Sequence, residues 1–340
     1  EKLEVEGNIV SKGTEWTLRT PLSPATDSWN SVVYGNGIFV AVGSSTVGLS
    51  PIMTSSDGIN WTHRPIPVAD VKLSSVTYGN GLFVAVSSLS AYVFTSPDGI
   101  NWNSNSIPLA NAWSSIAYGN KTFVAVALAT PFSPSCLPGG GIGSCVMTSS
   151  DGINWATSMT PESSAWLGVT YGNGLFVAVA GNGSSVMTSS DGKSWILRTA
   201  PAGYWYSVTY GNGLFVAVAL GNNYSCVNGT NQCVMTSPDG INWTIQVTPL
   251  GRWFRVTYGN GLFVAIGDRL ISSYTIMTSP NGVNWSTRNA PNGNWFSIAY
   301  GNGVFVGTAI NYPGSIGSQI MTSGKLDTPI TPHNNIYQGG

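Results

Sequence analysis

The chain consists of seven copies of one sequence module, and this repetition restricts its fold more than any other feature. Each copy contains a Gly-Asn pair followed by an apolar run, and the copies begin their pairs at Gly35, Gly79, Gly119, Gly172, Gly211, Gly259 and Gly301. A second marker is a tryptophan that recurs every 40 to 53 residues, at Trp16, Trp61, Trp102, Trp155, Trp195, Trp243 and Trp285. Repeats of this length are typical of architectures in which neighbouring units bury each other's apolar faces. Because the repeat spans nearly all 340 residues, we expect one large domain.

The residues of one module indicate four antiparallel strands. In the fifth copy, residues 205–210 are rich in aromatic and β-branched side chains, which favours a strand. The following Gly-Asn-Gly is a hairpin signal, and residues 214–218 are apolar on both faces, as in a strand that is covered on both sides. A variable loop precedes a third strand at residues 233–236, and a turn leads to a more polar fourth strand near Trp243. Charged residues at the ends of such outer strands discourage pairing with other chains.

Seven four-stranded units with buried inner strands predict an all-β fold, a seven-bladed β-propeller. The last module ends at Ser323 without a fourth-strand tryptophan, whereas residues 11–19 match residues 56–64 position for position. We therefore expect the N-terminal strand to complete the last blade and close the ring, since an open stack would need capping repeats. The predicted propeller comprises residues 11–325, between an N-terminal tail of residues 1–10 and a C-terminal tail of residues 326–340.

The turn between the third and fourth strands resembles the Asp-box, or BNR repeat, of sialidase-like propellers. Its pattern here is Ser-x-Asp-Gly-x-x-Trp, one residue tighter than the common family pattern, and Asn281 replaces the aspartate in the sixth module. The resemblance implies that the carboxylate ties down turn amides and has no catalytic role. The aspartates concerned are Asp57, Asp98, Asp151, Asp191 and Asp239. The whole repeat also looks like tandem repeats of bacterial surface proteins and of phage or large-virus structural proteins.

The composition favours a secreted or surface-exposed protein. Charged residues make up 8% of the chain, against about 25% in a typical soluble domain. The net charge of −1 disfavours nucleic acid as a partner, because phosphate binding needs clustered cations. No apolar run reaches the roughly 18 residues that a membrane helix needs, so no membrane insertion is expected. A chain that opens with Glu1 suits either a processed secreted protein or a trimmed chain.

The four cysteines form two close pairs in the sequence, and each pair precedes the same third-strand position. The pairs are Cys136 with Cys145 and Cys226 with Cys233. Neither spacing fits a zinc site, so we expect two local disulfides that close long loops in an oxidising compartment. Four free buried thiols are the alternative.

The sequence offers no credible catalytic constellation, and we expect neither enzymatic activity nor a metal or other cofactor. Arg19, Arg64, Arg198 and Arg288 lie on outermost strands, while Arg252, Arg255 and Arg269 all belong to the sixth module. They therefore cannot converge on a carboxylate from several blades, as a sialidase requires. Paired carboxylates for glycoside hydrolysis are scarce, and the two histidines provide no credible Ser-His-Asp arrangement. A degenerate sialidase-like glycosidase is the last alternative.

One face of the predicted ring carries the tight turns, and the opposite face carries the variable loops, where binding usually occurs. The loop face also carries a near-regular tryptophan at the start of each innermost strand, with Leu73 in the second module. These tryptophans either stack on sugars, as in propeller lectins, or fill the gaps between blades. They are Trp29, Trp113, Trp166, Trp205, Trp253 and Trp295.

Two further sequence features concern modification and assembly. Glycosylation sequons occur at Asn60, Asn120, Asn182, Asn223, Asn228, Asn242 and Asn284, in a chain so rich in Asn, Ser and Thr that chance supplies a similar number. The tails either fold back on the propeller or dock on a neighbouring subunit, for example by adding a strand to its sheet. The resulting expectation is a structural or adhesive building block that self-assembles through its tails, with a glycan-binding lectin as the main alternative.

Overall fold

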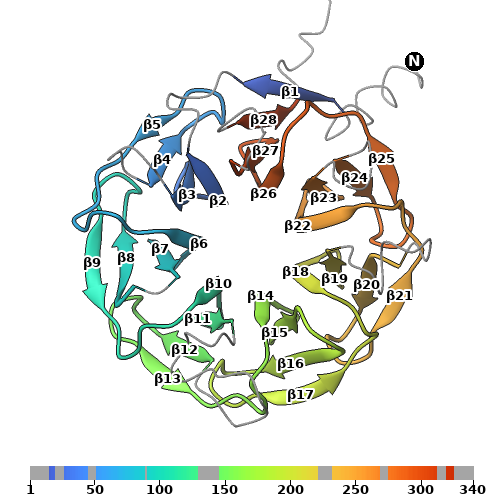
Figure 1. Cartoon of the computed structure of the whole chain (residues 1–340), viewed down its shortest axis with the longest axis horizontal. Helices are drawn as coiled ribbons and strands as arrows, with labels where there is room; N and C mark the ends of the chain where they lie inside the picture. The colour runs from blue at the N-terminus through green and yellow to red at the C-terminus, as the bar shows by residue number, and fades with distance from the viewer. Residues whose placement is uncertain are drawn as a thin grey trace, which may run out of the picture.

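The computed structural model describes residues 15–19, 27–44, 51–88, 90–128, 145–220, 232–268, 275–311 and 319–324. These residues form seven four-stranded antiparallel sheets arranged as blades around a central axis (Figure 1). Blade 1 comprises β2 (Ser28–Gly35), β3 (Ile38–Ser44), β4 (Ile52–Ser55) and β5 (Thr62–His63). Blade 2 comprises β6 (Leu73–Gly79), β7 (Leu82–Ser87), β8 (Tyr92–Ser96) and β9 (Asn103–Ser106). Blade 3 comprises β10 (Trp113–Gly119), β11 (Thr122–Ala127), β12 (Val146–Ser149) and β13 (Ala156–Ser158). The predicted seven-bladed propeller is confirmed.

The remaining blades repeat the same order. Blades 4 and 5 comprise β14 (Trp166–Gly172), β15 (Leu175–Ala180), β16 (Ser185–Ser189) and β17 (Ile196–Thr199); and β18 (Trp205–Gly211), β19 (Leu214–Ala219), β20 (Val234–Ser237) and β21 (Thr244–Gln246). Blade 6 comprises β22 (Arg252–Gly259), β23 (Leu262–Asp268), β24 (Ile276–Ser279) and β25 (Ser286–Arg288). Blade 7 comprises β26 (Trp295–Gly301), β27 (Val304–Ala309), β28 (Ile320–Ser323) and, from the other end of the chain, β1 (Trp16–Arg19).

The N-terminal strand completes the last blade, as expected. Strand β1 pairs antiparallel with β28, and Trp16 lies opposite Ser323 in the register. The pairing is extended by a hydrogen bond of 2.9 Å from the Gly324 amide to the Glu15 carbonyl. Arg19 adds a side-chain bond of 2.7 Å from Nε to the Thr322 hydroxyl. The expected tails, residues 1–10 and 326–340, lie outside the described residues.

The apolar core lies between the blades, because both faces of each second strand are covered. In blade 3, Phe123, Val124, Ala125 and Val126 of β11 are all fully buried. Phe123 packs in one cluster with Val84 of blade 2, whereas Val124 belongs to a second cluster with residues of blade 4. Each sheet is therefore covered on both sides by its neighbours, which is why the second strand is apolar throughout rather than alternating.

The Gly-Asn pairs make the hairpins between the first two strands and also join the blades. Asn36 and Gly37 have φ of 47° and 81°, as the tight hairpin requires. The preceding Gly35 is buried against the ring of Tyr78 in the next blade, and a Cβ on Gly35 would lie 2.2 Å from the Tyr78 ring. The same contact closes the circle seven times: Gly35–Tyr78, Gly79–Tyr118, Gly119–Tyr171, Gly172–Tyr210, Gly211–Tyr258, Gly259–Tyr300 and Gly301–Tyr34.

The Ser-x-Asp-Gly turn is held together by its own side chains. Asp98 Oδ1 accepts hydrogen bonds of 2.8 Å from the amides of Ile100 and Asn101, and Asp98 Oδ2 accepts one from Asn101 Nδ2. The Trp102 indole donates to the Gly99 carbonyl at 2.9 Å. Asn281 accepts the corresponding amide bonds in blade 6 at 2.9–3.0 Å. The aspartate in this turn therefore has a structural role.

Hydrogen bonding to the carboxylate lowers the pKa of these aspartates. For Asp98 the amide of Asn101 has the largest effect, and it holds the pKa well below its usual range. The pKa values of Asp151, Asp191 and Asp239 are lowered by the same kind of bond. Burial raises the pKa of Asp57, but the hydrogen bonds outweigh that effect and the net shift is again downward. All five carboxylates are therefore ionised at neutral pH.

The expectations about cysteines and sequons concern residues that are described in part. Cys145 and Cys233 are both buried and disulfide-bonded, whereas Cys136 and Cys226 lie outside the described residues, so the pairing stays a prediction.

The sequon asparagines that the structure describes are all exposed, namely Asn60, Asn120, Asn182, Asn242 and Asn284. Asn223 and Asn228 lie outside the described residues. The Nδ2 atoms of Asn60 and Asn242 donate to the turn aspartates Asp57 and Asp239. Glycosylation of these sites stays a prediction.

Candidate functional site

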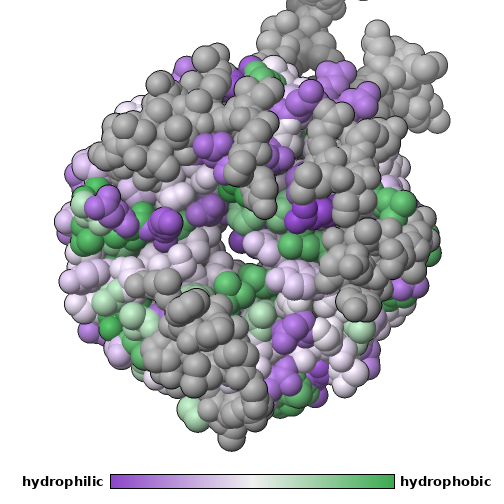
Figure 2. All heavy atoms as spheres, in the orientation of Figure 1, coloured by the Kyte–Doolittle hydropathy of each residue, from purple (hydrophilic) through white to green (hydrophobic). Residues whose placement is uncertain are grey.

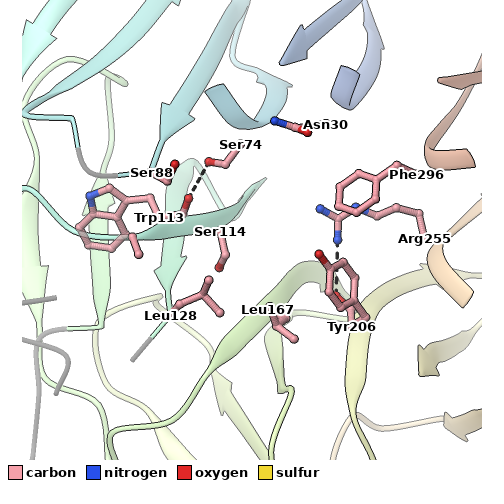
Figure 3. Close-up of a pocket in the computed structure, with 11 residues that line it drawn as sticks. Asn30, Ser74, Ser88, Trp113, Ser114, Leu128, Leu167, Tyr206, Arg255 and Phe296 are labelled. Carbon is pink, nitrogen blue, oxygen red and sulfur yellow. Dashed lines mark hydrogen bonds between the residues drawn. The ribbon is translucent and has the colours of Figure 1, made fainter. Parts of the chain in front are cut away.

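A pocket of about 230 Å³ lies on the axis of the ring, and every blade contributes to it. Figure 2 shows the hollow at the centre of this face, and Figure 3 shows the side chains around it. The lining residues are Asn30, Ser74, Ser88, Ala112, Trp113, Ser114, Leu128, Leu167, Tyr206, Arg255 and Phe296. Ser88 and Leu128 directly follow the second strands β7 and β11. The pocket therefore lies on the face of the variable loops, opposite the hairpins.

A repeated β-bulge explains how the innermost strands supply these side chains. The register shifts after the first core residue of every innermost strand, for example between Trp29 and Ser31 in blade 1. A bulge leaves one extra residue unpaired and bends the strand, which re-aims the neighbouring side chains. The bulge residues of six blades thus lie at the axis or beside it: Asn30, Ser74, Ser114, Leu167, Tyr206 and Phe296.

The residue after the bulge joins each blade to the next in most of the ring. In five blades this residue is a serine whose hydroxyl accepts the hydrogen bond of an amide in the following blade: Ser31, Ser75, Ser115, Ser207 and Ser297, at 3.1–3.4 Å. Blade 4 has Gly168 at this position, and a Cβ added to Gly168 would lie 3.1 Å from the backbone of Ser207 in blade 5. Blade 6 has Arg255, which has no hydroxyl to accept such a bond.

The pocket has two chemically different sides. Blades 1 and 2 contribute the polar residues Asn30, Ser74 and Ser88, and blade 3 contributes Ser114 together with the apolar Ala112, Trp113 and Leu128. The hydroxyls of Ser74 and Ser114 each donate to a carbonyl of their own blade and to one of the following blade. Blades 5 to 7 contribute Tyr206, Arg255 and Phe296 instead. A ligand in this pocket would therefore meet hydrogen-bonding groups on one side and aromatic faces with a cation on the other.

The aromatic side is a compact cluster. Tyr206 lies edge-on to Phe254 and Phe296, with ring centroids 5.5 Å and 5.9 Å apart, and the two phenylalanine rings are 5.0 Å apart. The guanidinium carbon of Arg255 lies 5.4 Å from the Tyr206 ring and 5.7 Å from the Phe296 ring. Figure 3 shows the guanidinium next to both rings. Burial raises the pKa of the Tyr206 hydroxyl and lowers the pKa of Arg255. Tyr206 is therefore neutral at physiological pH, whereas the guanidinium stays charged.

The two arginines of β22 have different partners. Arg252 forms an ion pair of 3.0 Å with Asp268, which is almost fully buried, and stacks on Phe254. Arg255 donates from Nη1 to the Tyr206 carbonyl at 3.4 Å, and it makes no ion pair with any residue that the structure describes. Asp268 is thus paired with Arg252, and Arg255 is the cation among the residues that line the pocket.

The six sequence-predicted tryptophans do not offer stacking faces. Each of them is at most 2% exposed, and each packs among residues of the preceding blade, as Trp113 does with Val84 and Val86. This burial corrects the sugar-stacking interpretation, because a ring enclosed on both sides cannot receive a sugar. It agrees with the alternative interpretation, in which the tryptophans fill the gaps between blades. Trp113 alone of these six lines the pocket.

The other residues considered for chemistry lie apart from the pocket. The outer-strand arginines Arg19, Arg64, Arg198 and Arg288 each donate from Nε to a third-strand threonine of their own blade at 2.7–3.1 Å. Arg269 lies outside the described residues. Among the described residues, no group of three or more His, Cys, Asp and Glu is placed to hold a metal ion. The described part also contains no helix long and apolar enough to cross a membrane.

Of the pocket-lining residues, the sequence pointed only to Trp113, and it missed the residues one or two positions after the leading tryptophans. It singled out the tryptophan that begins each innermost strand, because that residue recurs in almost every module. The following position varies widely, with Asn30, Ser114 and Leu167 in three modules and aromatic residues in the last three. Variation at one position of a fixed scaffold is the signal that could have found the site.

The comparisons with known proteins agree with this fold. No protein-family model matches the chain, and no curated protein matches it in sequence. Solved structures with a similar fold include virginiamycin B lyase from Staphylococcus aureus, with a TM-score of 0.69 and 12% identity over 91% of this chain and 99% of that chain. They also include a streptogramin B lyase, with a TM-score of 0.71 and 12% identity over 91% and 97% of the two chains. YCF48 bound to D1 peptide is a third, with a TM-score of 0.65 and 14% identity over 94% and 97%. At these identities the likeness shows the propeller fold alone.

Proposed function

We propose that this protein is a non-catalytic binding propeller that holds its ligand in the axial pocket of the loop face. The observation that carries the proposal is the break in repeat symmetry at the axis. Seven similar modules supply seven similar blades, yet three of them place Tyr206, Arg255 and Phe296 together where the others place small or aliphatic residues. Arg255 is also the one charged residue at its position in the module, where the other blades have serine or, in blade 4, Gly168.

The chemistry of the pocket supports binding. It offers aromatic faces, hydroxyl and amide groups, and one guanidinium, which are groups that hold and orient a ligand. Arg255 also takes the place of a serine that accepts a bond from the next blade elsewhere in the ring, and it donates instead to the Tyr206 carbonyl of the preceding blade. Residues that break a local rule in this way are expected at functional sites. One solved propeller of similar fold, YCF48, holds a peptide.

A fragment screen with a blocked pocket tests the proposal. Ligand-observed NMR would be recorded with four defined probe classes: apolar acids, apolar amines, monosaccharides with disaccharides, and short peptides. Ser88 is exposed at the rim of the pocket, so Ser88→Trp should fill the entrance without disturbing the core. We expect at least one probe class to bind the wild-type protein and to lose binding in Ser88→Trp.

The matched control is Ser190→Trp, an exposed serine in a turn of the opposite face. This variant should bind the same probes as the wild-type protein. If no class binds, or if Ser88→Trp and Ser190→Trp behave alike, the axial pocket is not the binding site. Saccharides that bind independently of Ser88→Trp would instead support the lectin alternative.

We also propose three separate hypotheses that the sequence suggests. They are membership among the Asp-box propellers, a secreted or surface location, and assembly through residues 1–10 and 326–340. The first is supported by the hydrogen bonds that Asp98 and its counterparts make within their turns. Light scattering of the full chain and of a chain without these terminal residues tests the last, since equal masses would exclude assembly through the tails. A catalytic, degenerate glycosidase would show turnover of aryl glycosides.

A further inference from the structure

We infer that the axial pocket selects an apolar carboxylate, an aromatic or aliphatic group bearing a free carboxylate, with Arg255 as the anion-binding residue. The inference rests on the proposed function and adds the chemical class of its ligand. The carboxylate belongs either to a small organic acid or to the last residue of a peptide. Both sources present the same chemistry to the pocket.

Arg255 has hydrogen-bond donors and a charge that a ligand could use. A guanidinium has five N–H donors in a planar fork, and here one of them donates to the Tyr206 carbonyl. Among the described residues Arg255 forms no ion pair, and the carboxylate of Asp268 pairs with Arg252. A half-buried cation without an anionic partner is costly to maintain, and a carboxylate that binds from solution would satisfy the remaining donors in a bidentate arrangement.

The aromatic rings next to Arg255 favour an apolar group on the ligand. The guanidinium carbon of Arg255 lies 5.4 Å from the Tyr206 ring and 5.7 Å from the Phe296 ring, and these two rings are neighbours with centroids 5.9 Å apart, so an anion that reaches Arg255 lies close to both rings. Rings in this position favour a ligand whose carboxylate is attached to an aromatic or aliphatic group, because a fully hydrated anion such as sulfate would lose water without gaining apolar contacts. Leu167 adds a further apolar surface next to Tyr206 (Figure 3).

The size of the pocket limits how much of a ligand it can enclose. A volume of about 230 Å³ is below the roughly 300–1,000 Å³ of pockets that enclose drug-sized ligands. It therefore accommodates one ring or one side chain with its carboxylate, and the remainder of a longer ligand would extend over the loop face. Asn30 of blade 1 and Ser88 of blade 2 offer polar groups to a peptide unit or to a second polar group of a small acid.

Calorimetric titration of acid and amide pairs tests the inference on the full chain. The probes are 3-phenylpropionate, N-acetylphenylalanine and its amide, and a pentapeptide with four glycines and a final phenylalanine, as the free acid and as the amide. We expect each acid to bind at least about tenfold more tightly than its amide, as for a hydrogen-bonded charge pair. Added NaCl should weaken the acids more than the amides.

Substitution of the arginine should abolish this preference. In Arg255→Met the acid and the amide should bind equally, and in Arg255→Lys a smaller preference for the acid should remain, because an ammonium lacks the planar fork. Arg198→Met is the matched control, since Arg198 bonds to Thr188 on the outside of blade 4, and it should keep the full preference. Thermal unfolding of each variant identifies any loss of fold.

The outcomes separate the two proposals. Equal binding of acids and amides to the wild-type protein would overturn the carboxylate inference, while binding that Ser88→Trp abolishes would keep the proposed function. Failure of these probes together with binding of another fragment class would also overturn the inference alone. Failure of every class would overturn both. Among the supporting outcomes, 3-phenylpropionate binding as tightly as the peptide acid identifies a small acid, and tighter binding of the peptide acid identifies a peptide end.

Discussion

At the residue scale, the turn aspartate shows how one side chain holds the turn between the third and fourth strands of a blade. Asp98 accepts bonds from two amides and from Asn101, and Ser96 donates to it as well. In blade 6 an asparagine makes the same amide contacts without a charge. The geometry of the oxygen acceptor, more than its charge, is therefore what the turn requires, and the charge adds a dependence on pH.

The first prediction concerns this turn. We expect Asp98→Ala to lower the free energy of unfolding by about 1–2 kcal/mol, as for the loss of a capping side chain, and Asp98→Asn to cost less than half of that. The measurement is urea-induced unfolding at pH 7. Equal losses in the two variants would show that the charge, and not the acceptor geometry, stabilises the turn.

The pH dependence of these variants has a definite sign. The folded-state pKa of Asp98 is lowered below the unfolded value of about 3.9, so its contribution is fully present above that value and is lost as the pH falls through the folded pKa. The stability of the wild-type protein should therefore decrease steadily below about pH 4. Asp98→Asn should decrease less steeply than the wild type, because one of the five titrating turns has been removed.

At the element scale, the blades are held together by contacts that recur at the same position of every module. The hairpin glycine of one blade lies against the tyrosine ring of the next, and the tyrosine also packs on the phenylalanine of its own second strand, as Tyr171 does on Phe176 at 4.8 Å. Hairpin asparagines add bonds to the neighbouring outer turn, such as the one from Asn120 Nδ2 to the Ser190 carbonyl at 3.1 Å. Repetition of these contacts is why the module is so regular in sequence.

The second prediction tests one of these contacts. In Gly119→Ala the new Cβ would lie 2.0 Å from the nearest atom of the Tyr171 ring, so blades 3 and 4 would have to separate or the ring would have to move. We expect a loss of about 2 kcal/mol or more in the free energy of unfolding, as for overpacked cores. Gly324→Ala is the control, because nothing lies within 4 Å of its added Cβ. Similar stability of the two variants in urea would show that the glycine–tyrosine contact is dispensable.

At the scale of the whole molecule, the ring is closed by pairing between the two ends of the described chain. The four register pairs from Trp16–Ser323 to Arg19–Ile320 replace a covalent connection that every other blade has. Trp16 also packs near Phe305, with ring centroids 6.4 Å apart. Without this strand, blade 7 would expose the edge of β28 and the apolar side of its second strand.

The third prediction concerns this closure. Removal of residues 1–19 should lower the free energy of unfolding by on the order of 3 kcal/mol, since ladder hydrogen bonds and the packing of Trp16 are lost. A permuted chain in which residues 27–323 are followed directly by residues 11–19 restores the missing strand through a turn of the same length as Ser55–Trp61. Thermal unfolding should show that the permuted chain is close to the wild-type protein in stability. A permuted chain no more stable than the truncated one would argue against the closure.

The amino-acid sequence by itself determined the architecture. The Gly-Asn hairpins, the apolar second strands and the outer-turn aspartates are local signals, and each is repeated often enough to be read without knowledge of the fold. The match between residues 11–19 and residues 56–64 located the closing strand for the same reason. Where a signal was ambiguous, as for Trp113 and Trp166, repetition favoured packing, and the buried positions of both rings agree with it.

Only the tertiary structure decided where a ligand could bind. The seven innermost strands meet at the axis although they are far apart in the chain, and Arg255 contacts Tyr206 across 49 positions. The bulge after each leading core residue, which directs the next side chain toward the axis, depends on pairing with the second strand and leaves no mark in the sequence of one module. The pocket is lined by residues of all seven blades, which are distant in sequence, and local periodicity carries no information about which of these residues will face one another.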